Sequence, residues 1–272
     1  MRRGLNENYA RELMELHTLG VDGGYTQKDV TEVARAFTGW TIRNPRVRGE
    51  FIFEPRLHDD REKTVLGHKV HGGGMKDGEQ VLDILAGHPS TARFISTKLA
   101  RRFVSDTPPP ALVDRLAARF TATRGDLREV MRTLLASPEF LAPDSFSAKT
   151  KTPFEFVASA VRATGRPLTD ARPFVRSLQE LGMPLYQCQP PTGYKDTADA
   201  WVNTGALVAR MNFAQSLASA PSFGVRSDRD RSTFDPLIGL NVSETTRSTI
   251  ARATTPQQSL ALTLGSPEFQ KR

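Results

Sequence analysis

Residues 6–40, NENYARELMELHTLGVDGGYTQKDVTEVARAFTGW, predict two helices joined by a tight glycine turn. In the first half, apolar residues recur at helical spacing, so one face can be buried; they are Leu5, Tyr9, Leu13, Leu16 and Leu19. Gly20 suits the end of that helix, because a left-handed backbone conformation costs least at glycine. Thr26 can cap the second helix, with Asp29 three residues on in the capping-box position. The stretch therefore predicts a helical hairpin.

The turn inside this stretch, VDGGYTQKD, also matches the second half of a calcium-binding helix-loop-helix. Asp22 and Asp29 fall where that loop places oxygen ligands. Counting back, the first two ligand positions fall on Thr18 and Gly20, where carboxylates are needed. The pattern thus favours a capped helical corner over a cation site. Asp22 and Asp29 remain the candidate metal ligands, and the sequence indicates no other cofactor.

The composition is that of an ordinary globular protein: 272 residues, 38% hydrophobic and 25% charged, with a formal net charge of +7. Basic residues are spread along the chain without long runs, so charge alone does not indicate nucleic-acid binding. The single cysteine, Cys188, excludes an intramolecular disulfide and a zinc cluster of thiolates. No stretch approaches the ~20 apolar residues of a membrane span. Residues 1–12 do not resemble a secretory signal.

Residues 41–74 interrupt the helical pattern as a long excursion rich in Gly, Pro, Arg and His. Two strand-like runs lie in it, 51–53 and 64–66, and they predict a small β-hairpin joined through residues 58–60. Loops of this length in compact proteins are usually functional or mobile.

Helical periodicity dominates the remainder of the chain. Further helices are expected over residues 77–87, 111–120, 125–135, 153–163, 173–181, 242–248 and 256–264. Residues 221–241 are polar and are predicted to be flexible. The fold expected over residues 1–272 is a single all-α domain, a multi-helical orthogonal bundle of helical hairpins with a long loop that carries the small β-hairpin.

Acids, imidazoles and an amine in the helical hairpin and the excursion are the candidates for catalysis: Glu12, His17, His58, Asp59 and Lys63. Glu12 and Glu15 share one helical face, as in half of a carboxylate metal site, but the Glu-x-x-His partner is absent. His58, Asp59 and Lys63 offer acid–base chemistry on a loop, where function often lies. No motif fixes a reaction geometry and GxSxG does not occur, so solvated polar side chains on a turn are the favoured interpretation.

Seven stretches carry a resemblance to a known family. They are NENYARELMELHTLGVDGGYTQKDVTEVARAFTGW, HDDREKTVLG, HPSTARFISTKLARRFVSDTPP, GDLREVMRTLLASPEF, KTPFEFVASAVRATG, PPTGY through Trp201, and the closing GSPEFQKR. Together they closely resemble a bacterial family known only as domain of unknown function eighteen-hundred. The resemblance implies a mostly helical protein that is usually longer, of which this chain is the C-terminal half. No catalytic residues are established for the family, so it assigns none here.

The resemblance also implies a partner and a range of compartments. Members are commonly encoded beside a second family of unknown function, numbered fifteen-hundred-and-one, which looks like an alkaline-phosphatase or sulfatase relative. Members often have export signals in the upstream part. A periplasmic or secreted location is therefore expected if an upstream part carries a signal, and this chain alone does not determine the compartment.

Two hypotheses follow. The first is a helical scaffold or partner-binding protein that acts with an exported enzyme; the loop at 190–194, PPTGY, offers an aromatic side chain, although a rigid connector fits it equally well. The alternative is a hydrolase-type enzyme, metal-dependent or not, in which acidic side chains of residues 6–40 and the His58–Asp59 loop form one site. Convergence of Glu12, His17, His58 and Asp59 in one cleft would favour the enzyme. Nucleic-acid binding ranks last and predicts a contiguous arginine face along residues 93–102.

Overall fold

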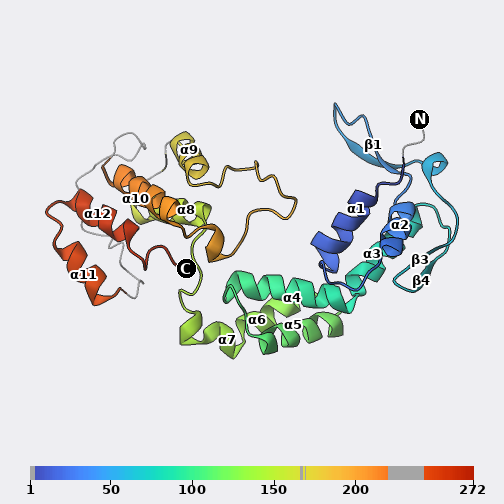
Figure 1. The fold of residues 1–272 in the computed structure, drawn as a ribbon, viewed down its shortest axis with the longest axis horizontal. Helices are drawn as coiled ribbons and strands as arrows, with labels where there is room; N and C mark the ends of the chain where they lie inside the picture. Colours follow the sequence, from blue (N-terminus) through green and yellow to red (C-terminus); the bar gives the residue numbers. More distant parts are fainter. Residues whose placement is uncertain (1–3, 166–167, 169, 220–241) are drawn as a thin grey trace. The chain divides into compact units, whose positions relative to one another are not determined.

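The computed structural model describes residues 4–165, 168, 170–219 and 242–272, and most of them are helical (Figure 1). The predicted all-α class, with a small β-hairpin element, is confirmed. The predicted flexible segment 221–241 lies outside the described residues. None of the described helices is long and apolar enough to cross a membrane.

The chain divides into two compact units. Unit 1 comprises Met1–Phe103 and Pro108–Ser137, and unit 2 comprises Val104–Thr107 and Pro138–Arg272. The grouping of residues 1–272 into one domain stays a prediction.

Unit 1 contains the helical hairpin that the opening stretch predicts. Its helices are α1 (Glu7–Glu12), α2 (Gln27–Ala36), α3 (Met75–Gly87), α4 (Pro89–Phe103), α5 (Pro110–Ala122) and α6 (Leu127–Leu135). A π-helical turn, η1 (Leu13–Thr18), continues α1, and the Thr18 hydroxyl donates to the Leu13 carbonyl oxygen at 2.8 Å. The predicted capping box is confirmed: the Thr26 hydroxyl caps α2, and the Asp29 carboxylate accepts a hydrogen bond from the Thr26 amide.

The excursion forms two hairpins instead of the single predicted one. Strand β1 (Trp40–Arg43) pairs with β2 (Glu50–Phe53), and β3 (Lys63–Val65) pairs with β4 (His68–Val70), both antiparallel. A 3-10 turn, η2 (Pro55–Leu57), lies between them. The predicted pairing of 51–53 with 64–66 is therefore wrong. The two-residue turn Leu66–Gly67, with φ of 48° and 80°, closes β3 onto β4. Closing this short turn costs less chain entropy than closing the longer loop that a pairing of 51–53 with 64–66 would need.

One hydrophobic core stabilises residues 10–85 of unit 1. It is built from α1, α2, α3 and the second hairpin, and its buried apolar residues are Ala10, Met14, Leu19, Val30, Val33, Ala34, Ala36, Phe37, Val65, Val70, Val81 and Leu85. The aromatic rings of Phe37 and Trp40 pack edge to face, with 4.9 Å between the ring centroids. Trp40 thereby fixes the base of the first hairpin to the helices.

Gly78 of α3 lies against the Trp40 indole, where a Cβ atom would come within 2.6 Å of the ring. We expect Gly78→Ala to lower the free energy of unfolding by about 1–2 kcal/mol, because overpacking outweighs the helix propensity that alanine adds. Urea denaturation measures the change. Gly87→Ala is the matched control, since Gly87 ends the same helix with open space around it. Equal shifts in both variants would contradict the packing argument.

Unit 2 is built from six helices among the described residues. They are α7 (Pro138–Leu141), α8 (Pro153–Ala163), α9 (Arg172–Glu180), α10 (Thr204–Ser219), α11 (Glu244–Ala251) and α12 (Pro256–Gly265), with short 3-10 turns η3 (Pro143–Ser145) and η4 (Ala198–Ala200). Phe156, Phe213 and Phe269 meet in edge-to-face contacts at the centre of its core. Residues 183–203, between α9 and α10, contain only the η4 turn as regular structure.

Candidate functional site

Three polar side chains of the excursion and α3 form a buried network. Lys63 is 1% exposed, Asp77 is 0% exposed, and the His58 side chain is completely buried. The Lys63 amine donates to the Asp77 carboxylate and to the Asp59 carbonyl oxygen. The Gly73 amide donates to the other Asp77 oxygen at 2.7 Å. The excursion is thus tied to the first turn of α3 by charge-assisted hydrogen bonds.

The His58 ring completes this network. Its Nε2 lies 3.2 Å from Asp77 Oδ2, and its Nδ1 lies 2.7 Å from the Thr38 carbonyl oxygen. Both ring nitrogens therefore lie within hydrogen-bond distance of oxygen atoms of Thr38 and Asp77. Burial alone would raise the pKa of Asp77, but the hydrogen bonds from Lys63 and Gly73 outweigh it, and the pKa lies below its ordinary value. The network is charged, paired and closed to solvent.

Asp59 lies next to this network but is occupied by two arginines. Arg35 Nε donates to it at 2.9 Å and Arg61 at 2.7 Å. These contacts, from Arg61 first and then Arg35, hold the pKa of Asp59 well below its usual range. Arg35 also binds Glu32 at 2.9 Å. A carboxylate held this way stays ionised and is a poor proton acceptor at ordinary pH.

The remaining predicted site residues lie elsewhere on unit 1. Glu12 accepts a hydrogen bond from Asn8 at 2.9 Å, and His17 is exposed on the π-helical turn. No contact among the described residues joins either of them to His58, Asp59 or Lys63. The structure therefore brings together His58 and Lys63, with Asp59 beside them, and adds Asp77, which the sequence analysis did not select as a site residue.

The two predicted metal ligands also have separate roles. Asp22 is exposed in the turn, whereas both Asp29 oxygens are engaged, one by Thr26 and the other by the Leu66 amide at 2.8 Å. Within the described part of the chain, no group of three or more His, Cys, Asp or Glu side chains is arranged to hold a metal ion. Along α4, Arg93 pairs with Asp114 and Lys98 lies over the Phe94 ring, so these two cations are already engaged.

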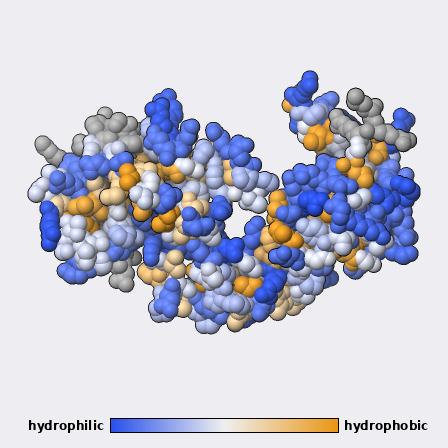
Figure 2. All heavy atoms as spheres, viewed as in Figure 1, coloured by the Kyte–Doolittle hydropathy of each residue, from blue (hydrophilic) through white to orange (hydrophobic). Residues whose placement is uncertain are grey.

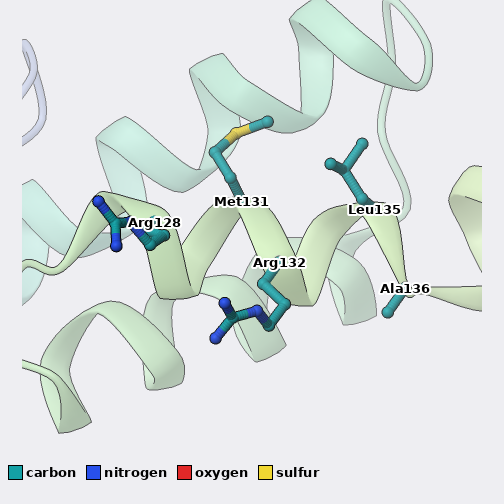
Figure 3. Close-up of a pocket in the computed structure, with 5 residues that line it drawn as sticks. All are labelled: Arg128, Met131, Arg132, Leu135 and Ala136. Atoms are coloured by element: carbon teal, nitrogen blue, oxygen red, sulfur yellow. The ribbon is translucent and has the colours of Figure 1, made fainter.

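An open pocket lies along α6 (Figure 3). Its lining consists of Arg128, Met131, Arg132, Leu135 and Ala136, and none of the predicted site residues is among them. Arg132 pairs with Glu129, and Figure 3 shows it on the opposite side of the helix from Met131. The pocket presents an apolar wall with little polar chemistry to position a substrate.

The 183–203 loop of unit 2 combines internal hydrogen bonds with an exposed aromatic side chain. Tyr194 Oη donates to the Pro184 carbonyl oxygen at 2.6 Å and Trp201 Nε1 donates to the Lys195 carbonyl oxygen at 2.8 Å. Tyr186 lies in the turn that the Gln187 amide closes onto the Pro184 carbonyl oxygen; its side chain is fully exposed, and its backbone φ is +60°. A side chain in this left-handed conformation costs roughly 1 kcal/mol or more, and such strain is concentrated at functional positions.

Unit 2 also buries two cations whose hydrogen bonds, within the described residues, go to carbonyl and amide oxygens. Lys151 is 9% exposed; its amine donates to the Phe269 carbonyl oxygen at 2.8 Å and lies 4.0 Å from the centre of the Phe269 ring. Arg210 is 2% exposed and donates to the Lys151 carbonyl oxygen at 2.7 Å and to Gln270 at 2.9 Å. Burial lowers the pKa of Lys151 to about 8. Together these side chains attach residues 269–270 to the segment that precedes α8 and to α10.

The fold and these contacts define a mostly helical protein in which three of the predicted acid–base residues, His58, Asp59 and Lys63, take part in contacts within unit 1. The chain belongs to the family described as "Protein of unknown function (DUF1800)", whose model matches residues 2–271. This confirms the family resemblance of the sequence, although it gives no support to the expectation that the chain is only the C-terminal half of a member. No match was found among curated proteins or among solved structures.

Proposed function

We propose that this protein binds a protein partner through the 183–203 loop of unit 2, with Tyr186 as the central anchor. The observation that carries the proposal is a fully exposed tyrosine in a strained left-handed conformation, in a turn next to Pro184, whose carbonyl oxygen accepts from Tyr194. Tyrosine is among the side chains that dominate binding energy at protein interfaces. Hydrogen bonds within the loop lower the entropy that the loop loses on binding.

The partner that the family resemblance implies is the phosphatase- or sulfatase-like protein encoded beside family members. In that role the protein is a scaffold for an exported enzyme. The alternative, a hydrolase, has less support: His58, Lys63 and Asp77 are closed to solvent, and Asp59 is occupied by Arg35 and Arg61. A catalytic group must reach its substrate within hydrogen-bond distance.

Tyr186→Ser is expected to weaken binding of the purified phosphatase-like protein roughly 30-fold, the loss typical of an interface hot spot. Isothermal titration calorimetry with the full chain measures it. Phe146→Ser is the matched control, because Phe146 is a 64% exposed aromatic side chain of the same unit. Binding that survives Tyr186→Ser, or absence of binding by the unmodified chain, would overturn the proposal.

Tyr186→Gly separates binding from stability in the same experiment. Glycine adopts positive φ without a steric penalty, so this variant should unfold at a slightly higher urea concentration while it loses the partner. A variant that loses binding because it is unfolded would instead shift to a lower concentration.

A further inference from the structure

The β1–β2 hairpin of unit 1 exposes apolar side chains that the core does not use. Ile42 and Phe51 lie directly opposite each other in the register, and they are 58% and 54% exposed. Opposed residues of an antiparallel pair share one face, so these two side chains are neighbours. Val47, in the turn, is 90% exposed. Figure 1 shows this hairpin extending beyond the helices of unit 1.

Arginines surround these apolar side chains. The turn and its flanks, RNPRVRGE at 43–50, hold three arginines against one glutamate. Arg46 and Arg48 flank Val47, and Arg43 pairs in register with Glu50. Within the described residues of this turn, one ion pair joins Arg48 to Glu50 at 3.9 Å, with both side chains more than half exposed. Figure 2 shows hydrophilic atoms at the far end of this projection and hydrophobic atoms next to them.

The hairpin holds its tip in a defined conformation. The Asn44 carbonyl oxygen accepts the amides of Val47, Arg48 and Gly49 at 3.0–3.3 Å. At the base, the Trp40 ring contacts Phe51 at 5.1 Å. The three arginines and Val47 are therefore presented together on a braced element, which reduces the ordering cost of binding.

Such a surface fits one kind of partner best. Guanidinium groups form bidentate hydrogen bonds to phosphate oxygens. A nucleic-acid backbone offers phosphates but no apolar layer for Val47, Ile42 and Phe51. A lipid bilayer offers both, because its phosphates lie directly over the acyl boundary where aromatic and aliphatic side chains are stable.

We propose that the tip of the β1–β2 hairpin binds the surface of an anionic phospholipid bilayer. Val47, in the turn, reaches the acyl boundary while Arg43, Arg46 and Arg48 contact lipid phosphates, and Ile42 and Phe51, farther from the turn, lie in the headgroup layer. This surface is separate from the Tyr186 loop, so either proposal can fail without the other.

The test is sedimentation of the full chain with vesicles of phosphatidylcholine, with or without phosphatidylglycerol. We expect binding only to the anionic vesicles, and release by added salt. Replacing Arg43, Arg46 and Arg48 together by Gln should weaken binding roughly 100-fold, about fivefold for each arginine. Val47→Asp should abolish binding, because it places a negative charge against the anionic surface. It should leave the structure of the protein unchanged, because Val47 is 90% exposed.

The matched control replaces Arg124, Arg176 and Arg252 by Gln, which removes the same charge from exposed positions elsewhere. It should bind as the unmodified chain does. Equal binding to both kinds of vesicle, equal binding by the two triple variants, or no binding to anionic vesicles would overturn the proposal. The proposal would also be overturned if the unmodified chain bound a DNA duplex but no vesicles, and if the Arg43, Arg46 and Arg48 variant lost that binding. Far-ultraviolet circular dichroism of each variant verifies the fold.

Discussion

Asp77→Ala is expected to lower the free energy of unfolding of unit 1 by about 3–5 kcal/mol, the range for breaking a buried ion pair. The substitution leaves the Lys63 amine and the His58 ring buried without their shared carboxylate. It also leaves the Gly73 amide without its acceptor. An uncompensated buried charge costs far more than a lost exposed pair, because solvent cannot replace the missing partner.

Urea denaturation monitored by circular dichroism measures this loss. Asp60→Ala is the control: Asp60 lies 3.8 Å from the same His58 nitrogen, but its side chain is 75% exposed, so it should change stability by less than about 1 kcal/mol. The double variant Lys63→Met/Asp77→Leu should recover part of the loss, since it removes both charges. Equal effects of Asp77→Ala and Asp60→Ala would contradict the role assigned to the buried network.

The pH dependence of Asp77 has a defined sign. Its folded-state pKa lies below the ordinary value, so the folded state favours the ionised carboxylate. The stabilisation is present in full above the unfolded-state pKa, near about 4, and is lost as pH falls through the lower folded-state pKa. The difference between the unmodified chain and Asp77→Ala should therefore shrink in acid.

Local patterns of the sequence were sufficient for the helices and their caps. Thr26 and Asp29 form the predicted capping box because every atom involved lies within one turn of helix. The predicted helix over 153–163 coincides with α8. Caps and helix bounds depend on residues within a few positions of each other, so a single sequence is enough to predict them.

The sequence did not predict the contacts that cross the chain. The sequence predicts Lys63 as an amine on a solvated loop, yet it is buried and donates to Asp77, 14 residues away in sequence. No local signal marks that pairing. In the 183–203 loop the PPTGY run offers the Tyr194 ring to a partner, but Tyr194 donates to the Pro184 carbonyl oxygen, whereas Tyr186 is the fully exposed ring. Which tyrosine is exposed depends on which one has a hydrogen-bond acceptor within the loop, and sequence alone does not show this.

Lys151 gives the second large effect, an increase in the stability of unit 2 with pH. Burial, with a smaller contribution from Arg210, lowers the pKa of Lys151 to about 8, and Glu155 opposes the shift. In the unfolded chain the amine titrates near about 10.4. The folded state therefore binds fewer protons between these values, and the free energy of unfolding rises with pH there. The gain should be about 1–2 kcal/mol, from 1.36 kcal/mol for each pKa unit after a discount for solvent screening.

Lys151→Met isolates this contribution, because methionine keeps the length of the side chain and removes its charge. We expect the stability of the unmodified chain relative to Lys151→Met to rise between about pH 8 and about pH 10.4. Denaturation of both proteins across that range measures the difference. Lys195→Met is the control: the Lys195 side chain is 72% exposed, so its substitution should change the stability by less than about 1 kcal/mol. A flat difference for Lys151→Met would mean that the buried amine titrates as it does in the unfolded chain, and that its contacts with Phe269 compensate fully for the water it loses.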